Sequence, residues 1–478
     1  MGYTQYDLTI IGGGSAGLTA AQVAHSLGAR VLLIDKERLG GDCLFSGCVP
    51  SKSLLHVARI VHQAQTSVRS GLLAGDSASV DMEKVSQYIQ EVIGRIAINE
   101  QAYTTGVDVA FGKVTFASRT TLNLDGRKIT TRHTLIATGS RPAIPPLPGL
   151  EKITYLTNES VFDLQQLPAS LVIIGGGPVG IELGQAFNRL GTQVTILQRA
   201  TCILPREETE VSEALTRLLR TEGITIHTGI RIKEIKQAGP KKIIILQQGE
   251  QEREIAADDI LIATGRKPVV TDLNLEAAGV AYTEQGIQVN DYLQTTTPNI
   301  LALGDVLGGY YFTHVAAYQA GIAVRNALLP FGKKKVDYRV VPWCTFTDPE
   351  AGRLGLTETE ARTRYKHVQA LHFPWQEIDR AQTENERDGF IKLILAGKKQ
   401  EIVGAHLIGA HAGELLGEIA LVMKLRLPIS AIYQVIHPYP TYSSGLQQAA
   451  FNAYLQSKNA STNRKLIRTI LRLQKYYP

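Results

Sequence analysis

The chain has 478 residues, of which 44% are hydrophobic and 20% charged, with 44 glycines and 19 prolines. These fractions are close to globular averages and exclude a disordered or fibrous chain, while the length predicts about two to four domains. Only four cysteines are present, which excludes a secreted scaffold built on disulfides. No apolar run approaches the ~18 residues of a membrane helix, and a strand pattern begins already at Asp7. We therefore expect no spanning segment, no signal peptide and a cytoplasmic location.

The net charge of +6 comes from one end of the chain. Residues 457–478 contain six lysines and arginines and no acid, and the 44 basic residues that remain balance 44 acidic ones. A nucleic-acid surface would need a basic face on a folded domain, so we expect no nucleic-acid partner. Leucines and isoleucines between Leu466 and Leu473 form a stripe with the arginines largely opposite, which predicts an amphipathic helix. Such a helix either packs on its own protein or lies weakly on an anionic membrane surface.

One arrangement of elements occurs twice in the chain. Each copy has a predicted strand, a glycine-rich loop, a predicted helix and a second strand, over residues 7–35 and 171–197. Both loops read G-x-G-x-x-G in the strand–helix context of a unit that binds a dinucleotide pyrophosphate on the amides of the helix start. The expected contact residues in the two loops are Gly12, Gly14, Ser15, Ala16 and Gly17, and Gly175, Gly177, Pro178, Val179 and Gly180.

The end of the second strand differs between the copies. The first copy has Asp35, followed by Lys36, where a carboxylate binds ribose hydroxyls and repels a 2′-phosphate. The second copy has Gln198 there, followed by Arg199, with Arg206 further along. Guanidinium groups in the absence of an acid suit a 2′-phosphate by charge and geometry. The alternative to such a contact is that Arg199 is an ordinary solvated arginine. We expect FAD in the first copy, and NADPH rather than NADH in the second.

Both copies later carry a similar strand ending. The segment Leu135–Pro142 reads LIATGSRP, and Leu261–Pro268 reads LIATGRKP. This ending begins later in the first copy: its alanine lies 125 residues after the first loop glycine, against 88 in the second copy, so the first copy contains 37 extra residues. We expect the first ending to contact FAD through Thr138 and Gly139, and the second to contact NADPH through Gly265.

Two cysteines lie in this insertion, with four residues between them. The segment Gly40–Lys52 reads GGDCLFSGCVPSK and leads into an apolar helical pattern. Amides at a helix start and the ammonium of the last lysine both favour a thiolate, so we expect Cys43 and Cys48 to be redox-active. Two cysteines do not supply a four-ligand zinc site, and we expect no bound metal. Cys202 and Cys344 stand alone and are interpreted as small apolar residues.

A cysteine segment of this form after a glycine loop resembles the FAD-dependent pyridine nucleotide-disulfide oxidoreductases, which include glutathione reductase, dihydrolipoamide dehydrogenase and mercuric reductase. The resemblance covers about residues 5–455. It implies a redox-active disulfide in which Cys48 lies against the flavin and Cys43 attacks the substrate. It also implies that Glu182, beside the NADPH, pairs with Lys52 near the flavin. The further FAD contacts that it implies are Gly41, Asp42, Lys52, Gly304 and Asp305.

The chain departs from the disulfide-reducing members of that family near residue 440. Those members carry H-P-T-x-x-E, a histidine–glutamate pair offered to the partner subunit's cysteines, whereas residues 437–446 read HPYPTYSSGL. Tyr439 takes the histidine position and Ser444 the glutamate position, so the acid–base pair is missing. Either His437 or Tyr439 substitutes for it. The Pro-Tyr-x-Thr stretch resembles mercuric reductases, although the vicinal cysteines with which those enzymes capture the metal are absent here.

Together these features predict an α/β protein with two Rossmann-like dinucleotide-binding domains and a C-terminal α+β dimerisation domain. The predicted parts are residues 1–150 and 269–340 for FAD, 151–268 for NAD(P)H, 341–455 for the dimer interface and 456–478 for the basic amphipathic segment. We expect a homodimeric enzyme that passes electrons from NADPH through FAD to a Cys43–Cys48 disulfide, and then to a disulfide or a soft-metal acceptor. Two alternatives stay open, a diaphorase or quinone reductase that bypasses the thiols and a redox-sensing or membrane-docking flavoprotein.

Overall fold

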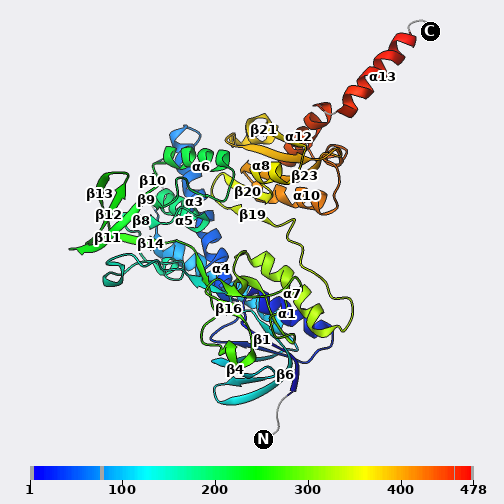
Figure 1. Cartoon of the computed structure of the whole chain (residues 1–478). Helices are drawn as coiled ribbons and strands as arrows, with labels where there is room; N and C mark the ends of the chain where they lie inside the picture. Colours follow the sequence, from blue (N-terminus) through cyan, green and yellow to red (C-terminus); the bar gives the residue numbers. More distant parts are fainter. Residues whose placement is uncertain (1–4, 76–79, 457, 475–478) are drawn as a thin grey trace. The chain divides into compact units, whose positions relative to one another are not determined.

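The computed structural model describes residues 5–75, 80–456 and 458–474 (Figure 1). Its contacts divide the chain into two compact units, one of residues 1–201 with 222–337 and the other of residues 202–221 with 338–478. The domain limits that the sequence suggests at 150/151 and 268/269 fall inside the first unit and stay predictions. Among the described residues, no helix is both long enough and apolar enough to cross a membrane.

A seven-stranded sheet forms the centre of the first unit, in the order β3-β2-β1-β6-β5-β4, with β18 also paired to β6. Its inner strands are parallel and buried, as strands covered on both faces must be. Helices α1 (Ser15–Ser26) and α7 (Thr313–Leu328) contact each other and pack on it. The strands are β1 (Gln5–Ile11), β2 (Val31–Asp35), β3 (Asp108–Phe111), β4 (Val114–Ser118), β5 (Thr121–Leu124), β6 (Arg127–Ile136) and β18 (Ile300–Ala302).

A second parallel sheet, with four strands in the order β10-β9-β8-β14, repeats this arrangement. Helix α5 (Pro178–Leu190) follows β8 as α1 follows β1, and the antiparallel strands β11-β12-β13 share an apolar cluster with the sheet. The strands are β8 (Ser170–Ile174), β9 (Gln193–Gln198), β10 (Thr225–Thr228), β11 (Arg231–Ala238), β12 (Lys241–Gln248), β13 (Gln251–Ala257) and β14 (Asp259–Ile262). These elements confirm the predicted internal repeat.

The two similar strand endings pair with each other. They form β7 (Ser140–Pro142) and β15 (Arg266–Pro268), an antiparallel ladder in which Ser140 lies opposite Pro268. The two halves of the repeat are thus joined where their sequences match. The other short elements of this unit are β16 (Tyr282–Thr283), β17 (Gly286–Ile287), η1 (Ala102–Thr104), η2 (Leu150–Lys152), η3 (Val161–Asp163), η4 (Leu275–Ala278) and η5 (Gly304–Leu307).

The extra residues of the first copy form helices α2 (Gly41–Phe45), α3 (Cys48–Arg69) and α4 (Met82–Gln101) between β2 and β3. Leu54 and Ala58, one turn apart, are buried on the inner face of α3. α3 contacts both α4 and α5. The helix that begins at the second cysteine is therefore fixed by packing on two sides.

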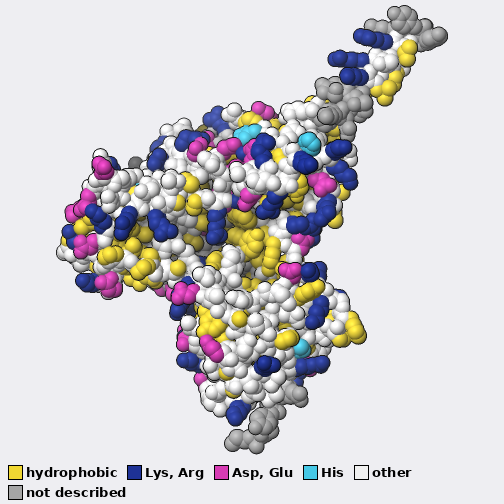
Figure 2. Space-filling model, viewed as in Figure 1, with side chains coloured by type: hydrophobic (Ala, Val, Ile, Leu, Met, Phe, Trp, Pro, Cys, Tyr) yellow, Lys and Arg dark blue, Asp and Glu magenta, His cyan; other side chains and the backbone are white. Residues whose placement is uncertain are grey.

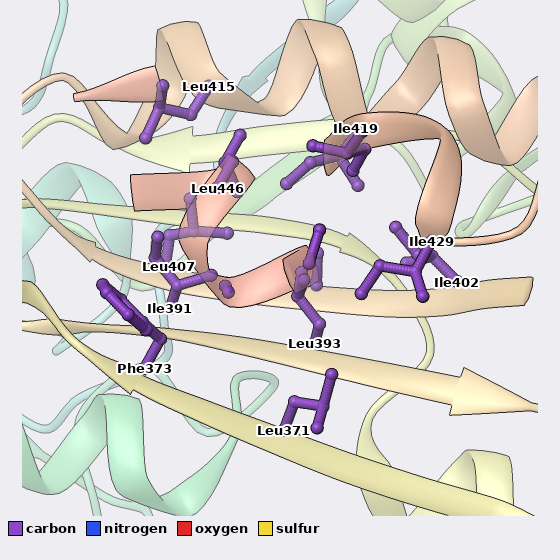
Figure 3. Close-up of a cluster of buried hydrophobic side chains, with 14 of the residues drawn as sticks. Leu371, Phe373, Ile391, Leu393, Ile402, Leu407, Leu415, Ile419, Ile429 and Leu446 are labelled. Carbon is purple, nitrogen blue, oxygen red and sulfur yellow. The ribbon is translucent and has the colours of Figure 1, made fainter. Parts of the chain in front are cut away.

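The second unit is built on a five-stranded antiparallel sheet in the order β19-β20-β23-β22-β21. Figure 3 shows apolar side chains of the sheet, such as Leu393 and Leu407, facing Ile419 and Leu446 of two helices, which confirms the predicted α+β class. The strands are β19 (Pro342–Thr345), β20 (Glu350–Gly355), β21 (Val368–Pro374), β22 (Phe390–Ala396) and β23 (Glu401–Gly409). The helices are α6 (Thr209–Thr221), α8 (Glu358–Arg364), η6 (Trp375–Glu377), α9 (Asp379–Glu384), α10 (Ala412–Lys424), α11 (Ser430–Tyr433), α12 (Ser443–Gln456) and α13 (Lys458–Gln474).

Ion pairs tie α6 to this sheet, although its neighbours in sequence belong to the first unit. The Lys392 ammonium on β22 lies 3.4 Å from a carboxylate oxygen of Glu208, 3.0 Å from one of Glu210 and 2.9 Å from one of Glu358. The Lys392 side chain is only 4% exposed, so its charge requires these partners. Of the three carboxylates, Glu210 lies in α6, Glu208 directly precedes it and Glu358 lies in α8, so the pairs join α6 and α8 to β22.

Replacing Leu393 with alanine should destabilise the second unit. The side chain is fully buried in the cluster of Figure 3, and its removal leaves a cavity that should lower the free energy of unfolding by about 2–5 kcal/mol. Both tryptophans of the chain, Trp343 and Trp375, lie in this unit, so their fluorescence during denaturant unfolding reports it. The matched control Leu393→Met conserves volume and should cost less than about 1.5 kcal/mol. Equal unfolding midpoints for the two variants would contradict the packing described.

Candidate active site

The two cysteines lie on consecutive helices of the first unit. Cys43 is in α2, and Cys48 is the first residue of α3, where the backbone amides have no partner within the helix. Gly47 lies in the turn between them. The turn requires a glycine there, because a Cβ at this position would lie 2.9 Å from the Asp42 carbonyl oxygen. Both thiols are free. The short turn holds the two sulfurs close enough to interact.

Thr313, the first residue of α7, lies beside both sulfurs. Its hydroxyl donates to Cys43 Sγ at 3.1 Å and lies 3.8 Å from Cys48 Sγ. It is 270 residues from Cys43 in the chain, and sequence reasoning missed it. No motif marks this threonine, because only the packing of α7 on the first sheet brings it to the thiols.

The two thiols have opposite proton affinities. A hydrogen bond from Cys43 is the largest cause that lowers the pKa of Cys48, to about 6, and the Lys52 ammonium and the Thr313 hydroxyl lower it further. The same hydrogen bond, together with burial, raises the pKa of Cys43. These shifts favour a Cys48 thiolate beside a Cys43 thiol at neutral pH, and the thiolate is lost as the pH falls through about 6.

The structure brings the predicted pair Lys52 and Glu182 together. The Lys52 ammonium, in the second turn of α3, lies 2.7 Å from Glu182 Oε2 on α5. The Glu182 side chain is 6% exposed and that of Lys52 is 34% exposed. A buried carboxylate needs a cation, so this pair fixes the Lys52 ammonium between α3 and α5.

The first glycine loop has the geometry that a dinucleotide requires. Gly12 has a φ of +108°, and a Cβ there would lie 2.2 Å from the Ala137 carbonyl oxygen. A Cβ on Gly17 would lie 1.8 Å from the carbonyl oxygen of Gly12, so the helix packs closely on the loop. Asp35 Oδ2 accepts from the Gly13 amide at 2.6 Å. The carboxylate is thereby held at the loop, and the arrangement fits FAD.

The second glycine loop repeats this geometry with one change of charge. Gly175 has a φ of +122°, and a Cβ on Gly180 would lie 2.0 Å from the Gly175 carbonyl oxygen. Gln198 Oε1 accepts from the Gly176 amide at 3.1 Å, the bond that a carboxylate oxygen accepts in the first loop. A neutral amide therefore stands where the first copy has a negative charge, and the loop fits a nicotinamide dinucleotide.

A polar network surrounds the predicted flavin residue Asp305. Burial raises the pKa of this carboxyl group, and Ser140 Oγ donates to its Oδ2 at 2.6 Å. Arg266 Nε donates to Ser140 Oγ at 2.7 Å, and its Nη2 lies 2.8 Å from Asp42 Oδ2. Sequence reasoning did not single out Arg266. The signal that could have found it is the alignment of the two strand endings, in which Arg266 corresponds to Ser140, one of two positions at which the endings differ.

Most of the other predicted contact residues lie at the loops of the first unit. They are Gly14, Ser15 and Ala16 at the start of α1, Lys36 after β2, Gly41 in α2, Thr138 and Gly139 after β6, Gly304 in η5, Gly177, Pro178 and Val179 at the start of α5, Arg199 after β9, and Gly265 after β14. Arg206 instead belongs to the second unit, where its carbonyl oxygen accepts from the Arg353 guanidinium.

The two predicted acid–base candidates, His437 and Tyr439, lie in different surroundings in the second unit. His437 Nε2 lies 3.0 Å from Glu418 Oε1, its Nδ1 lies 2.9 Å from the Val435 carbonyl oxygen, and its side chain is 5% exposed. Tyr439 is 74% exposed, and its hydroxyl donates to Asp379 Oδ2 at 3.0 Å, a bond that raises its pKa. Both ring nitrogens of His437 are thus engaged within the chain, whereas the phenol faces outward. Sequence reasoning assigned no role to Glu418 or Asp379.

Comparison with known proteins agrees with this geometry. Residues 6–320 match the pyridine nucleotide-disulphide oxidoreductase family, and residues 341–450 match its dimerisation domain, which supports a homodimer. The chain is 38% identical to a mercuric reductase of Staphylococcus aureus over 453 residues, 93% of this chain and 82% of the relative. It is 34% identical to a dihydrolipoyl dehydrogenase of Bacillus subtilis over 450 residues, 92% of this chain and 97% of the relative.

A solved structure gives the same result in three dimensions. The Cu(II) complex of the HOCl-induced flavoprotein disulfide reductase RclA from Escherichia coli matches with a TM-score of 0.84 at 30% identity, covering 94% of this chain and 99% of that one. The chain therefore belongs to the pyridine nucleotide-disulfide oxidoreductases, a family of enzymes that depend on FAD and use NAD(P)H.

Proposed function

We propose that this enzyme passes electrons from NADPH through FAD to the Cys43–Cys48 pair and then to a soft-metal ion or a disulfide, with the metal ion as the better acceptor. The observation that carries the proposal is the placement of Cys43 and Cys48 on consecutive helices, with Thr313 beside both sulfurs; this placement favours a Cys48 thiolate, with a pKa of about 6, beside a Cys43 thiol whose pKa is raised. An unpaired structural cysteine would have no reason for this asymmetry.

Bound FAD supplies the chemistry that takes a hydride from the nicotinamide and hands on two electrons. Opening a Cys43–Cys48 disulfide consumes two electrons and one proton, and it leaves one thiolate and one thiol. The pKa difference assigns the proton to Cys43 and the negative charge to Cys48. The Lys52 ammonium favours that charge, and Glu182 holds the ammonium in place. In this proposal Glu182 is a positioning residue.

A soft-metal acceptor suits these two sulfurs, because thiolates prefer soft ions. As the ion binds, Cys43 loses its proton to water. Two electrons then pass from the sulfur pair to one divalent ion such as Hg²⁺, or singly to two Cu²⁺ ions, and the disulfide between Cys43 and Cys48 forms again. A relative named mercuric reductase and a structural neighbour described as a Cu(II) complex support this acceptor class.

A disulfide acceptor needs an additional acid. Cys43 would attack one sulfur, a mixed disulfide would form, and the departing thiolate would require a proton. In a homodimer the residues near 440 would be offered to the partner's thiols, as the family resemblance implies. The His437 side chain is buried with both ring nitrogens engaged by Glu418 and Val435, which leaves the exposed Tyr439 phenol, whose hydroxyl donates to Asp379, as the candidate acid. A phenol is a poor acid at neutral pH, and this favours the metal ion as acceptor.

Replacing Cys43 with serine should abolish transfer to the acceptor. Without this thiol the disulfide cannot form, so NADPH oxidation driven by Hg²⁺ in excess low-molecular-weight thiol should fall by at least about 10³-fold. Anaerobic bleaching of the flavin by NADPH should persist, because that step precedes the thiols. The matched control Cys344→Ser should keep full activity. Undiminished Hg²⁺-dependent activity in the Cys43 variant would contradict the thiol relay and support direct transfer from the flavin.

The NADPH preference rests on Gln198 and Arg199, as proposed from the second strand. Replacing Arg199 with alanine should raise KM for NADPH about 10- to 100-fold, because one charge-assisted contact to the 2′-phosphate is lost. KM for NADH should change little. Steady-state kinetics with both nucleotides measures the difference, with exposed Arg127→Ala as control. Equal changes in KM for NADPH and NADH would show that Arg199 does not recognise the 2′-phosphate.

A further inference from the structure

Helix α13 carries an apolar stripe that no other part of the described chain covers. Its side chains from Lys465 to Gln474 are all exposed, and the helix contacts α12, which precedes it. The five large apolar side chains of this stretch are between 44% and 58% exposed. These five are Leu466, Ile467, Ile470, Leu471 and Leu473. One of the two predicted alternatives is that this helix packs on the chain's own surface. The structure does not show this packing for these five side chains, because they are exposed.

The exposed residues are segregated around the helix. At 3.6 residues per turn, the five apolar side chains cover an arc of about 160°, and Lys465, Arg468 and Arg472 cluster within about 60° on the other side. Figure 2 shows the same separation, with yellow side chains along one edge of α13 and dark-blue side chains along the other. This pattern is that of a helix lying in an interface between an apolar and an aqueous phase.

The charge of the helix indicates what covers the stripe. The sequence of α13 contains Lys458, Arg464, Lys465, Arg468 and Arg472 and no aspartate or glutamate. Packed along their stripes, two copies would leave these cations facing solvent, so that arrangement does not account for a helix without acidic residues. An anionic lipid surface instead offers acyl chains to the stripe and phosphate groups to the cations, which reach it along their flexible stems.

We propose that α13 binds this enzyme to anionic lipid membranes, with its apolar stripe in the headgroup–acyl boundary and its cations at the lipid phosphates. The proposal goes beyond the electron-transfer function and does not depend on it. The single amphipathic helix predicts reversible binding that depends on lipid charge.

Co-sedimentation of the full-length holoenzyme with vesicles tests the proposal. Vesicles of phosphatidylcholine with about one third phosphatidylserine should bind at least about tenfold more enzyme than phosphatidylcholine alone. High salt should reduce binding, since it screens the cations. Arg468→Glu with Arg472→Glu, and separately Ile467→Ser with Leu471→Ser, should each lose the binding. The matched control Lys398→Glu with Lys399→Glu, in the exposed turn between β22 and β23, should retain it.

Several outcomes would overturn the proposal. These are absent binding to the anionic vesicles, equal binding to neutral vesicles, and binding that survives both α13 variants. A change of oligomeric state in the Ile467→Ser and Leu471→Ser variant, measured by light scattering, would assign the stripe to a second copy. Binding of polyglutamate without vesicle binding would assign it to an acidic protein. Unchanged flavin absorbance and an unchanged unfolding midpoint in each variant show that the enzyme itself is intact.

Discussion

The active site depends on the interaction between the neighbouring thiols of Cys43 and Cys48. It is the largest cause of both pKa shifts, lowering that of Cys48 to about 6 and raising that of Cys43. The remaining features of the site keep the two thiols in place. Gly47 closes the turn between the helices, Thr313 binds Cys43, and Lys52 adds a positive charge near Cys48. A thiol pair without these constraints would carry its charge on either sulfur.

The repeated fold gives each cofactor its own version of one loop. In both copies a glycine turn packs against a strand ending. A side chain at the end of the second strand accepts from the amide of the residue after the first loop glycine, Gly13 or Gly176. The acceptor is Asp35 in one copy and Gln198 in the other. The backbone geometry is kept, while the side chain at the end of the second strand changes from a carboxylate to a neutral amide.

Local patterns predicted much of the structure. The two glycine loops, the insertion and the pair of Lys52 with Glu182 follow from residues that occur close together in sequence or in a family motif. Thr313 and Arg266 could not be found in this way, because the folding of distant segments places their side chains. The choice between His437 and Tyr439 likewise required the position of Glu418 on α10. Arg206 shows that closeness in sequence can also mislead. It is seven residues from Arg199 in the chain, yet it belongs to the other unit.

An anaerobic titration of the holoenzyme with NADPH, followed by visible absorbance, tests the thiol–thiolate account most directly. A Cys48 thiolate against oxidised flavin should give a long-wavelength charge-transfer band after two electrons, absent in Cys48→Ser. Because the pKa of Cys48 is lowered to about 6, the band should persist at neutral pH and disappear as the pH falls through that value. Direct bleaching of the flavin without such a band at neutral pH would contradict the account.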